Sequence, residues 1–162
     1  AQTENEKNAP TVILCYAIKD RIVHIVNITR KWLLSTAIEN QIKADVMMYG
    51  DYRSKVYIEP KSTGPGVITH LHQETDINVI DYEFRDHTGA IVRQQNKELR
   101  VYGWAPKAEA GRLKVLKDAP WTSEYIEEIV TFPNSIYKDQ TDTTSMAMEL
   151  ASQVNYGYEV RV

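Results

Sequence analysis

Two long runs of β-branched and aromatic residues stand almost side by side near the start of the chain, and they constrain its fold more than any other feature. The runs are TVILCYAIK at residues 11–19 and RIVHIVNITRKW at residues 21–32. Val, Ile, Thr and Tyr favour extended backbone. The polar residues Lys19, Asp20 and Arg21 at the junction leave space only for a tight turn, so the pattern predicts an antiparallel β-hairpin.

Segments with helical spacing of apolar residues alternate with short extended runs over the rest of the chain. In the first such segment, Leu34, Ile38 and Ile42 share one face of a predicted helix. The predicted elements are helices at 33–50, about 66–74, 96–106, 121–132 and 138–153, strands at 55–59, 77–84 and 111–117, a second hairpin at 85–93, a loop at 1–10 and a tail at 154–162. A hairpin followed by alternating helices and strands predicts an α/β domain whose mixed sheet is flanked by helices, with the parallel strands after the antiparallel pair.

Composition narrows the classes of protein that the chain can belong to. Its 162 residues predict one domain, and 43% hydrophobic with 25% charged residues is ordinary for a soluble globular protein. The net charge of −3 argues against a general polyanion binder, so any contact with nucleic acid needs a local basic patch. No apolar run approaches the ~18 residues of a transmembrane helix. The single Cys15 cannot form an internal disulfide, which suits a reducing compartment.

Three carboxylates stand where a binding site can form. Glu59 closes the strand predicted at 55–59, and ligands in α/β folds lie beyond the carboxyl ends of parallel strands. A solvated residue at a strand terminus has the same pattern. Asp139 and Asp142 open the last predicted helix and lie on one of its faces. They suit a helix cap with favourable dipole charges and they also suit a metal site, and the two roles are compatible.

Four basic residues gather around the second predicted hairpin and the helix after it: Arg85, Arg93, Lys97 and Arg100. They form either a solvated charged face or a flank that contacts nucleic-acid phosphates. A histidine metal site is not expected, because His70 and His72 point to different faces of a short helix. The chain has no Walker A sequence, so ATP binding by this segment is not expected.

An ordered set of motifs resembles the C-terminal nuclease domain of phage terminase large subunits, which has the RNase H-like fold. The first is an acid that ends a buried strand before a glycine loop and helix, VYIEPKSTGPGVITHL at 56–71. The second is a Lys, then an Arg, then an acidic-glycine segment ahead of a Trp, within NKELRVYGWAPKAEAGRLKVLKDAPW at 96–121. The third is a Phe-Pro pair before aspartates that open the last helix, FPNSIYKDQTDTTSMAMELA at 132–151. The resemblance spans about residues 10–153.

The resemblance implies a metal-dependent endonuclease. Glu59 and Asp139 would be metal ligands, with Asp142 a ligand or its close support, and Lys138 stands where the family usually has the first of two adjacent aspartates. Two Mg²⁺ or Mn²⁺ ions would serve hydrolysis of double-stranded DNA with little sequence preference. The basic residues named above would offset the acids beside DNA. Two other classes stay open: a nuclease of the resolvase or integrase type, and a non-enzymatic packaging domain that keeps the fold.

The resemblance also implies a longer protein. The family's first acid lies on a strand that precedes the hairpin, and residues 1–10 resemble the loop after it, so the chain is expected to be a fragment lacking that strand. One side of strand 11–19 would then be unpaired or covered by another chain. The expected partners are double-stranded DNA, the terminase ATPase domain, the small terminase subunit and the portal, in the cytoplasm of a bacterial host and without a membrane.

Overall fold

The chain's computed structural model describes residues 10–85, 88, 90–92, 96–153 and 158–161. It begins with the predicted hairpin: β1 (Thr11–Lys19) pairs antiparallel with β2 (Ile22–Lys31). Asp20 and Arg21 form its tight turn, with φ angles of 53° and 61° in the left-handed region that two-residue hairpin turns require. The hairpin prediction is confirmed.

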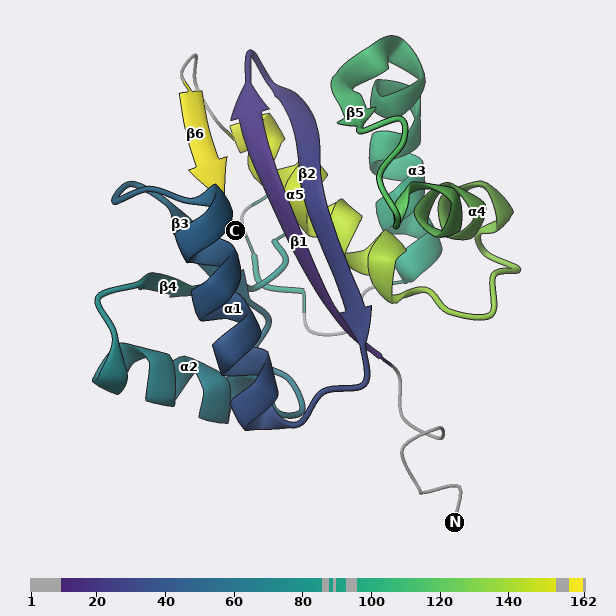
Figure 1. Cartoon of the computed structure of the whole chain (residues 1–162). Helices are drawn as coiled ribbons and strands as arrows, with labels where there is room; N and C mark the ends of the chain where they lie inside the picture. The colour runs from purple at the N-terminus through teal and green to yellow at the C-terminus, as the bar shows by residue number, and fades with distance from the viewer. Residues whose placement is uncertain (1–9, 86–87, 89, 93–95, 154–157, 162) are drawn as a thin grey trace.

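The hairpin lies within a six-stranded sheet of order β4-β3-β6-β1-β2-β5 (Figure 1). The other strands are β3 (Lys55–Ile58), β4 (Asn78–Asp81), β5 (Leu113–Val115) and β6 (Tyr158–Arg161). β3 is parallel to β4 and to β6, β5 is parallel to β2, and β1 is antiparallel to both of its neighbours. The predicted mixed α/β class is therefore confirmed.

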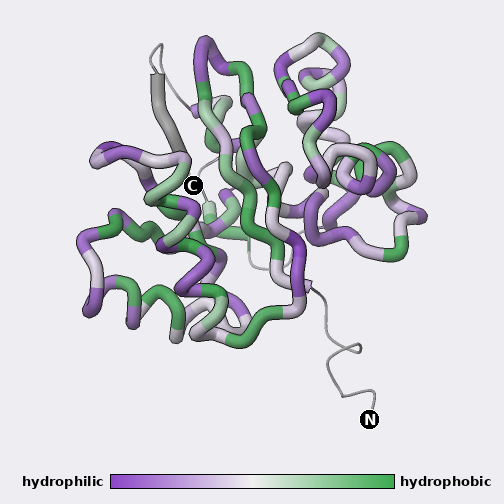
Figure 2. The backbone as a smooth tube through the Cα atoms, in the orientation of Figure 1, coloured by the Kyte–Doolittle hydropathy of each residue, from purple (hydrophilic) through white to green (hydrophobic). Residues whose placement is uncertain are grey.

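Helices cover both faces of the sheet (Figure 1). They are α1 (Ser35–Tyr49), α2 (Gly64–Glu74), α3 (Lys97–Lys107) with a π-helical turn after it (Ala108–Arg112), α4 (Thr122–Thr131) and α5 (Asp139–Gln153). Alternate side chains of β1 divide between two cores: Ile13 and Cys15 pack with α1 and α2, whereas Leu14 and Tyr16 pack with α5. Figure 2 shows the hydrophobic stretch of β1 and β2 that lies between these layers. Within the described ranges, no helix is long and apolar enough to cross a membrane.

Several predicted boundaries differ from the structure. Helix α2 begins at Gly64, because Pro65 suits a first helical turn. β4 ends at Asp81, and among the described residues of the second predicted hairpin Arg85 and Ile91 form an isolated bridge. The last residues, predicted as a tail, contain strand β6. β6 pairs with Tyr16–Lys19, so the prediction that β1 is unpaired or covered by another chain is wrong for that part of β1.

Candidate metal centre

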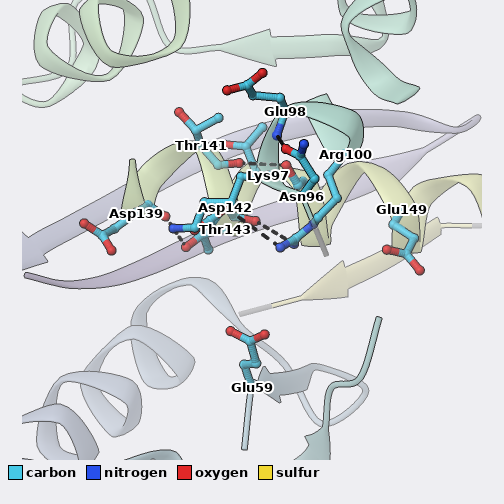
Figure 3. Close-up of polar contacts among 12 residues, drawn as sticks. Glu59, Asn96, Lys97, Glu98, Arg100, Asp139, Thr141, Asp142, Thr143 and Glu149 are labelled. Atoms are coloured by element: carbon cyan, nitrogen blue, oxygen red, sulfur yellow. Dashed lines mark hydrogen bonds and ion pairs between the residues drawn. The ribbon is translucent and has the colours of Figure 1, made fainter. Parts of the chain in front are cut away.

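A cavity of about 350 Å³ opens between the two helical layers at the carboxyl end of β3. Its inner walls are largely apolar, with Ile42 of α1 on one side and Met146 of α5 on the other. Glu59, Asp139 and Asp142 also line it. In Figure 3, Glu59 rises from one wall toward the helix that carries both aspartates. The structure therefore brings the three predicted acids to one cavity.

The cavity lies between β1 and β3, in line with β6 and beyond its paired residues. β6 pairs with β1 only at Tyr16–Lys19, and with β3 only at Lys55. Beyond those pairs, the cavity is lined by Thr11–Leu14 of β1 and Val56–Ile58 of β3. Adjacent strands lie ~4.8 Å apart, so β1 and β3 stand about two strand spacings apart where β6 separates them. Among the described residues, no strand fills that position beside the first half of β1.

Glu59 is fixed by a tight backbone approach. The carbonyl oxygen of Glu59 accepts a 2.7 Å hydrogen bond from the Lys61 N–H, and Gly64 N–H donates to the Lys61 carbonyl at 2.8 Å. A Cβ added at Gly64 would lie 2.3 Å from the Glu59 carbonyl oxygen, so only glycine fits. The Glu59 carboxylate pairs with the exposed Lys61 ammonium at 2.6 Å. This loop therefore holds the backbone of Glu59 against the start of α2.

Asp139 and Asp142 occupy the first turn of α5, where their negative charges interact favourably with the positive end of the helix dipole. Both also line the cavity, so the dipole role and a ligand role remain compatible. Burial raises the pKa of the Asp139 carboxyl above its ordinary value, and the charges of Glu128 and Asp142 add to the effect while Lys97 opposes it. Asp139 is thus a carboxylate kept in an environment that disfavours its charge, which is common at functional sites.

Helix α3 supplies two cations to Asp142. Lys97 forms an ion pair with the Asp142 carboxylate, and Arg100 Nη1 lies 3.8 Å from Oδ1. The Arg100 side chain is only 9% exposed, and its guanidinium lies 3.0 Å from the centroid of the Phe84 ring. Burial lowers the pKa of Arg100, while the charges of Asp142 and Glu59 oppose that shift. Arg100 therefore balances charge between the two walls of the cavity.

The three acids share a cavity without being gathered into a formed ligand set. Within the part of the chain that the structure describes, no three His, Cys, Asp or Glu side chains are close enough together to hold a metal ion. Glu59 and Asp142 each face a lysine instead. Carboxylate oxygens are the ligands that Mg²⁺ and Mn²⁺ prefer, so the chemistry of the donors fits these ions. An ion at the site would replace the lysines as the counter-charge.

The four basic residues predicted to contact DNA differ in their surroundings. Lys97 is half exposed and pairs with Asp142, and Arg85 is exposed at the isolated bridge. Arg100 points inward to Asp142 and Phe84, and Arg93 lies outside the described residues. Contact with DNA stays a prediction for all four residues.

Sequence reasoning missed Glu128, a residue that supports the site. Only 4% of it is exposed, and its carboxylate accepts hydrogen bonds from Gln140 and Thr141 in the first turn of α5. The signal was present in the sequence WTSEYIEEIVTF at 121–132, because Glu128 follows Tyr125 by three residues and so falls on the apolar face of its helix. A carboxylate on a buried helix face requires partners.

Comparison with known protein families agrees with this geometry. The six-stranded mixed sheet between helical layers defines an α/β domain with an RNase H-like fold. A family model described as a terminase RNaseH-like domain matches residues 1–151, and the chain therefore belongs to that family. None of the curated proteins matches the chain. The family that the sequence motifs indicated is thus confirmed.

Proposed function

We propose that the chain is the nuclease domain of a phage DNA-packaging terminase large subunit and hydrolyses double-stranded DNA with the help of two divalent cations. The observation that carries this proposal is the convergence of Glu59, which directly follows β3, with Asp139 and Asp142 from α5 on one cavity. These acids come from opposite helical layers, and ordinary helix capping gives no reason for Glu59 to face the start of α5. The family match supports the same assignment.

The residues present would hold Mg²⁺ or Mn²⁺ through carboxylate oxygens. Glu59 and Asp139 are the proposed ligands, with Asp142 a ligand or their close support. When bound, such ions would supply charge stabilisation to the attacking and leaving oxygens of a phosphodiester. Arg100 would balance the charge of Asp142, and Lys97, which is half exposed, would meet a DNA phosphate once it leaves Asp142.

A further acid on an upstream strand completes the proposed site. A strand joined to β1 through residues 1–10 and antiparallel to it would run parallel to β3, because β1 is antiparallel and β3 parallel to β6. Its carboxyl end would then lie beside Glu59, between β1 and β3 where the cavity lies. Double-stranded DNA, the ATPase domain, the small subunit and the portal, in the host cytoplasm, are the proposed partners and setting.

The test compares two versions of the protein in one plasmid-nicking assay with Mn²⁺. Residues 1–162 alone are expected to bind the ion weakly and to cleave poorly, because they would lack the proposed upstream ligand. A longer version that carries the upstream strand is expected to cleave without sequence preference. Equal and robust activity in both versions would contradict the proposed missing acid.

A non-enzymatic packaging domain is the second candidate, and one observation favours it. Glu59 and Asp142 are each held by a lysine, which is a stable arrangement without any metal ion. Absence of cleavage by both versions, with Mn²⁺ binding also absent, would favour this candidate over the nuclease.

A further inference from the structure

The carboxylate of Glu128 is buried where α4 meets the first turn of α5. Gln140 Nε2 donates to Glu128 Oε2 at 2.8 Å, and the backbone N–H of Thr141 donates to Oε1 at 2.9 Å. The Thr141 hydroxyl donates to Oε1 at 3.2 Å. Glu128, Gln140 and Thr141 are 4%, 1% and 1% exposed. One carboxylate of α4 thus binds two consecutive residues at the start of the site helix.

These contacts satisfy two requirements at once. The first backbone N–H groups of a helix have no acceptor within the helix, and their positive dipole end favours a nearby anion. A buried carboxylate is costly unless donors surround it. Glu128 meets both needs, since it accepts from the Thr141 N–H as a cap supplied by another helix.

Arg30 of β2 extends the junction to the sheet and to the approach into α5. Its Nη1 lies 3.6 Å from Glu128 Oε2, and it also pairs with Glu124 of α4. Its guanidinium lies 5.1 Å from the centroid of the Tyr137 ring, two residues before α5 begins. The sheet, α4 and the start of α5 therefore meet at the charge of Glu128.

The two residues that Glu128 holds are those between the site acids. Gln140 and Thr141 face the buried junction, while Asp139, Asp142 and Thr143 line the cavity. A helix turns 100° per residue, so fixing one face of its first turn also fixes the direction of the opposite face. A rotation of this turn would move both aspartates relative to Glu59.

We propose that Glu128 is a positioning residue, which aims Asp139 and Asp142 at the metal through its hydrogen bonds to Gln140 and Thr141. The inference rests on the proposed metal-dependent function. Glu128 itself touches neither metal nor DNA. Outer residues that orient metal ligands typically contribute about 10–100-fold to metal affinity.

The test measures Mn²⁺ affinity by calorimetry on residues 1–162, with circular dichroism confirming that each variant is folded. Glu128→Ala removes all the hydrogen bonds and is expected to weaken Mn²⁺ binding about 10-fold or more. Glu128→Gln is expected to stay within about threefold of the parent, because its amide oxygen accepts from Thr141 and its NH₂ donates to a turned Gln140 amide. Glu127→Ala, at the exposed neighbouring position, is the matched control and should change nothing.

Rescue by Gln and loss of affinity in a folded Ala variant are results that a merely structural role would not produce. Unchanged Mn²⁺ affinity in folded Glu128→Ala would overturn the inference while leaving the proposed function intact. If Glu128→Ala does not fold, Glu128→Asp decides, because it keeps the charge but retracts the carboxylate. Its affinity is expected to fall about threefold or more, and an unchanged value overturns the inference. Absence of Mn²⁺ binding both by residues 1–162 and by the longer version overturns the proposed function, and this inference with it.

Discussion

The two walls of the cavity hold their acids by different physical means. On the α5 wall, the buried polar side chains are joined by hydrogen bonds: Tyr125 to Thr144, Trp104 to Ser145 and Gln140 to Glu128. On the opposite wall, Glu59 stands on a short loop held by close backbone packing rather than by buried side-chain contacts. The comparison shows that the position of Glu59 depends on the absence of a side chain at Gly64. The positions of Asp139 and Asp142 depend instead on side chains that only tertiary structure brings together.

The largest effect is expected from adding a methyl group to the Glu59 loop. Gly64→Ala places a Cβ against the Glu59 carbonyl oxygen, so the loop must shift, at a cost of about 1–3 kcal/mol in the free energy of unfolding. Gly66→Ala is the matched control, since its added Cβ meets nothing within 4 Å and should stabilise helix α2 by about 0.5–1 kcal/mol. Urea unfolding measures both. Equal effects of the two changes would contradict the account of the Glu59 wall.

On the α5 wall, Arg100→Ala is expected to lower the free energy of unfolding by about 1–2 kcal/mol. It removes a buried cation that contacts Phe84 and balances Asp142. Lys97→Ala removes a half-exposed partner of the same carboxylate, and it should cost less than about 0.5 kcal/mol because solvent screens that pair. Chemical denaturation of both variants tests the ranking, and a larger loss from Lys97→Ala would reverse it.

Asp45 of α1 is a buried carboxylate that is only partly hydrogen-bonded, unlike the buried polar side chains of the α5 wall. It gives a pH-dependent prediction. It is 3% exposed, Gln41 donates to its Oδ1, and its Oδ2 has no hydrogen-bond partner. Burial raises the pKa of Asp45, with hydrogen bonds from Gln41 and Cys15 opposing the rise. The pKa of Asp45 is therefore higher in the folded protein than in the unfolded chain. Its contribution to the free energy of unfolding is fully present at a pH below the unfolded-state pKa, and it is lost as the pH rises through the folded-state pKa.

Asp45→Asn removes this titration. The variant should therefore be more stable than the parent at neutral pH, by up to about 1 kcal/mol, and the difference should shrink as the pH falls toward the ordinary range of aspartate. Thermal unfolding at several pH values measures the difference. A gain in stability that is constant across pH would show that the pKa of Asp45 is the same in the folded and unfolded states, and would contradict the raised pKa.

The smallest effect concerns DNA. Lys97→Ala should weaken binding about equally for all sequences and reduce the slope of log affinity against log salt by about one. Lys107→Ala, at the other end of α3, is the control and should leave the slope unchanged. Fluorescence anisotropy across a salt series measures both slopes. A loss confined to particular sequences would indicate that Lys97 reads bases instead.

Much of the fold could be predicted because its signals are local. The β-branched runs of β1 and β2, the spacing of Ile38 and Ile42 in α1, and the acid at the end of β3 are all visible within short windows. β6 could not be predicted in this way. Its four residues, YEVR, pair with β1 about 140 positions earlier in the chain, and no local pattern records such a partner.

The candidate site likewise has residues that could be predicted from local sequence and residues that could not. The positions of Glu59, Asp139 and Asp142 at element ends could be read from the sequence, whereas their meeting was implied only by the family resemblance. The direction of Arg100 could not be read, because a charged residue on a helix normally faces solvent and only the approach of Phe84 and Asp142 turns it inward. The place of Glu128 on the apolar face of its helix was visible in the sequence, but its partners were not, since they follow 12 and 13 positions later in α5, after an intervening loop.

One measurement tests most directly whether the two walls hold a common metal ion. Calorimetric titration of Mn²⁺ into the parent protein, Glu59→Ala, Asp139→Ala and the double variant compares one acid from each wall. Each single change is expected to weaken binding about 10-fold or more, and the double change should lose less than the sum of the two because both acids serve one site. Unchanged Mn²⁺ affinity in both single variants would contradict the account.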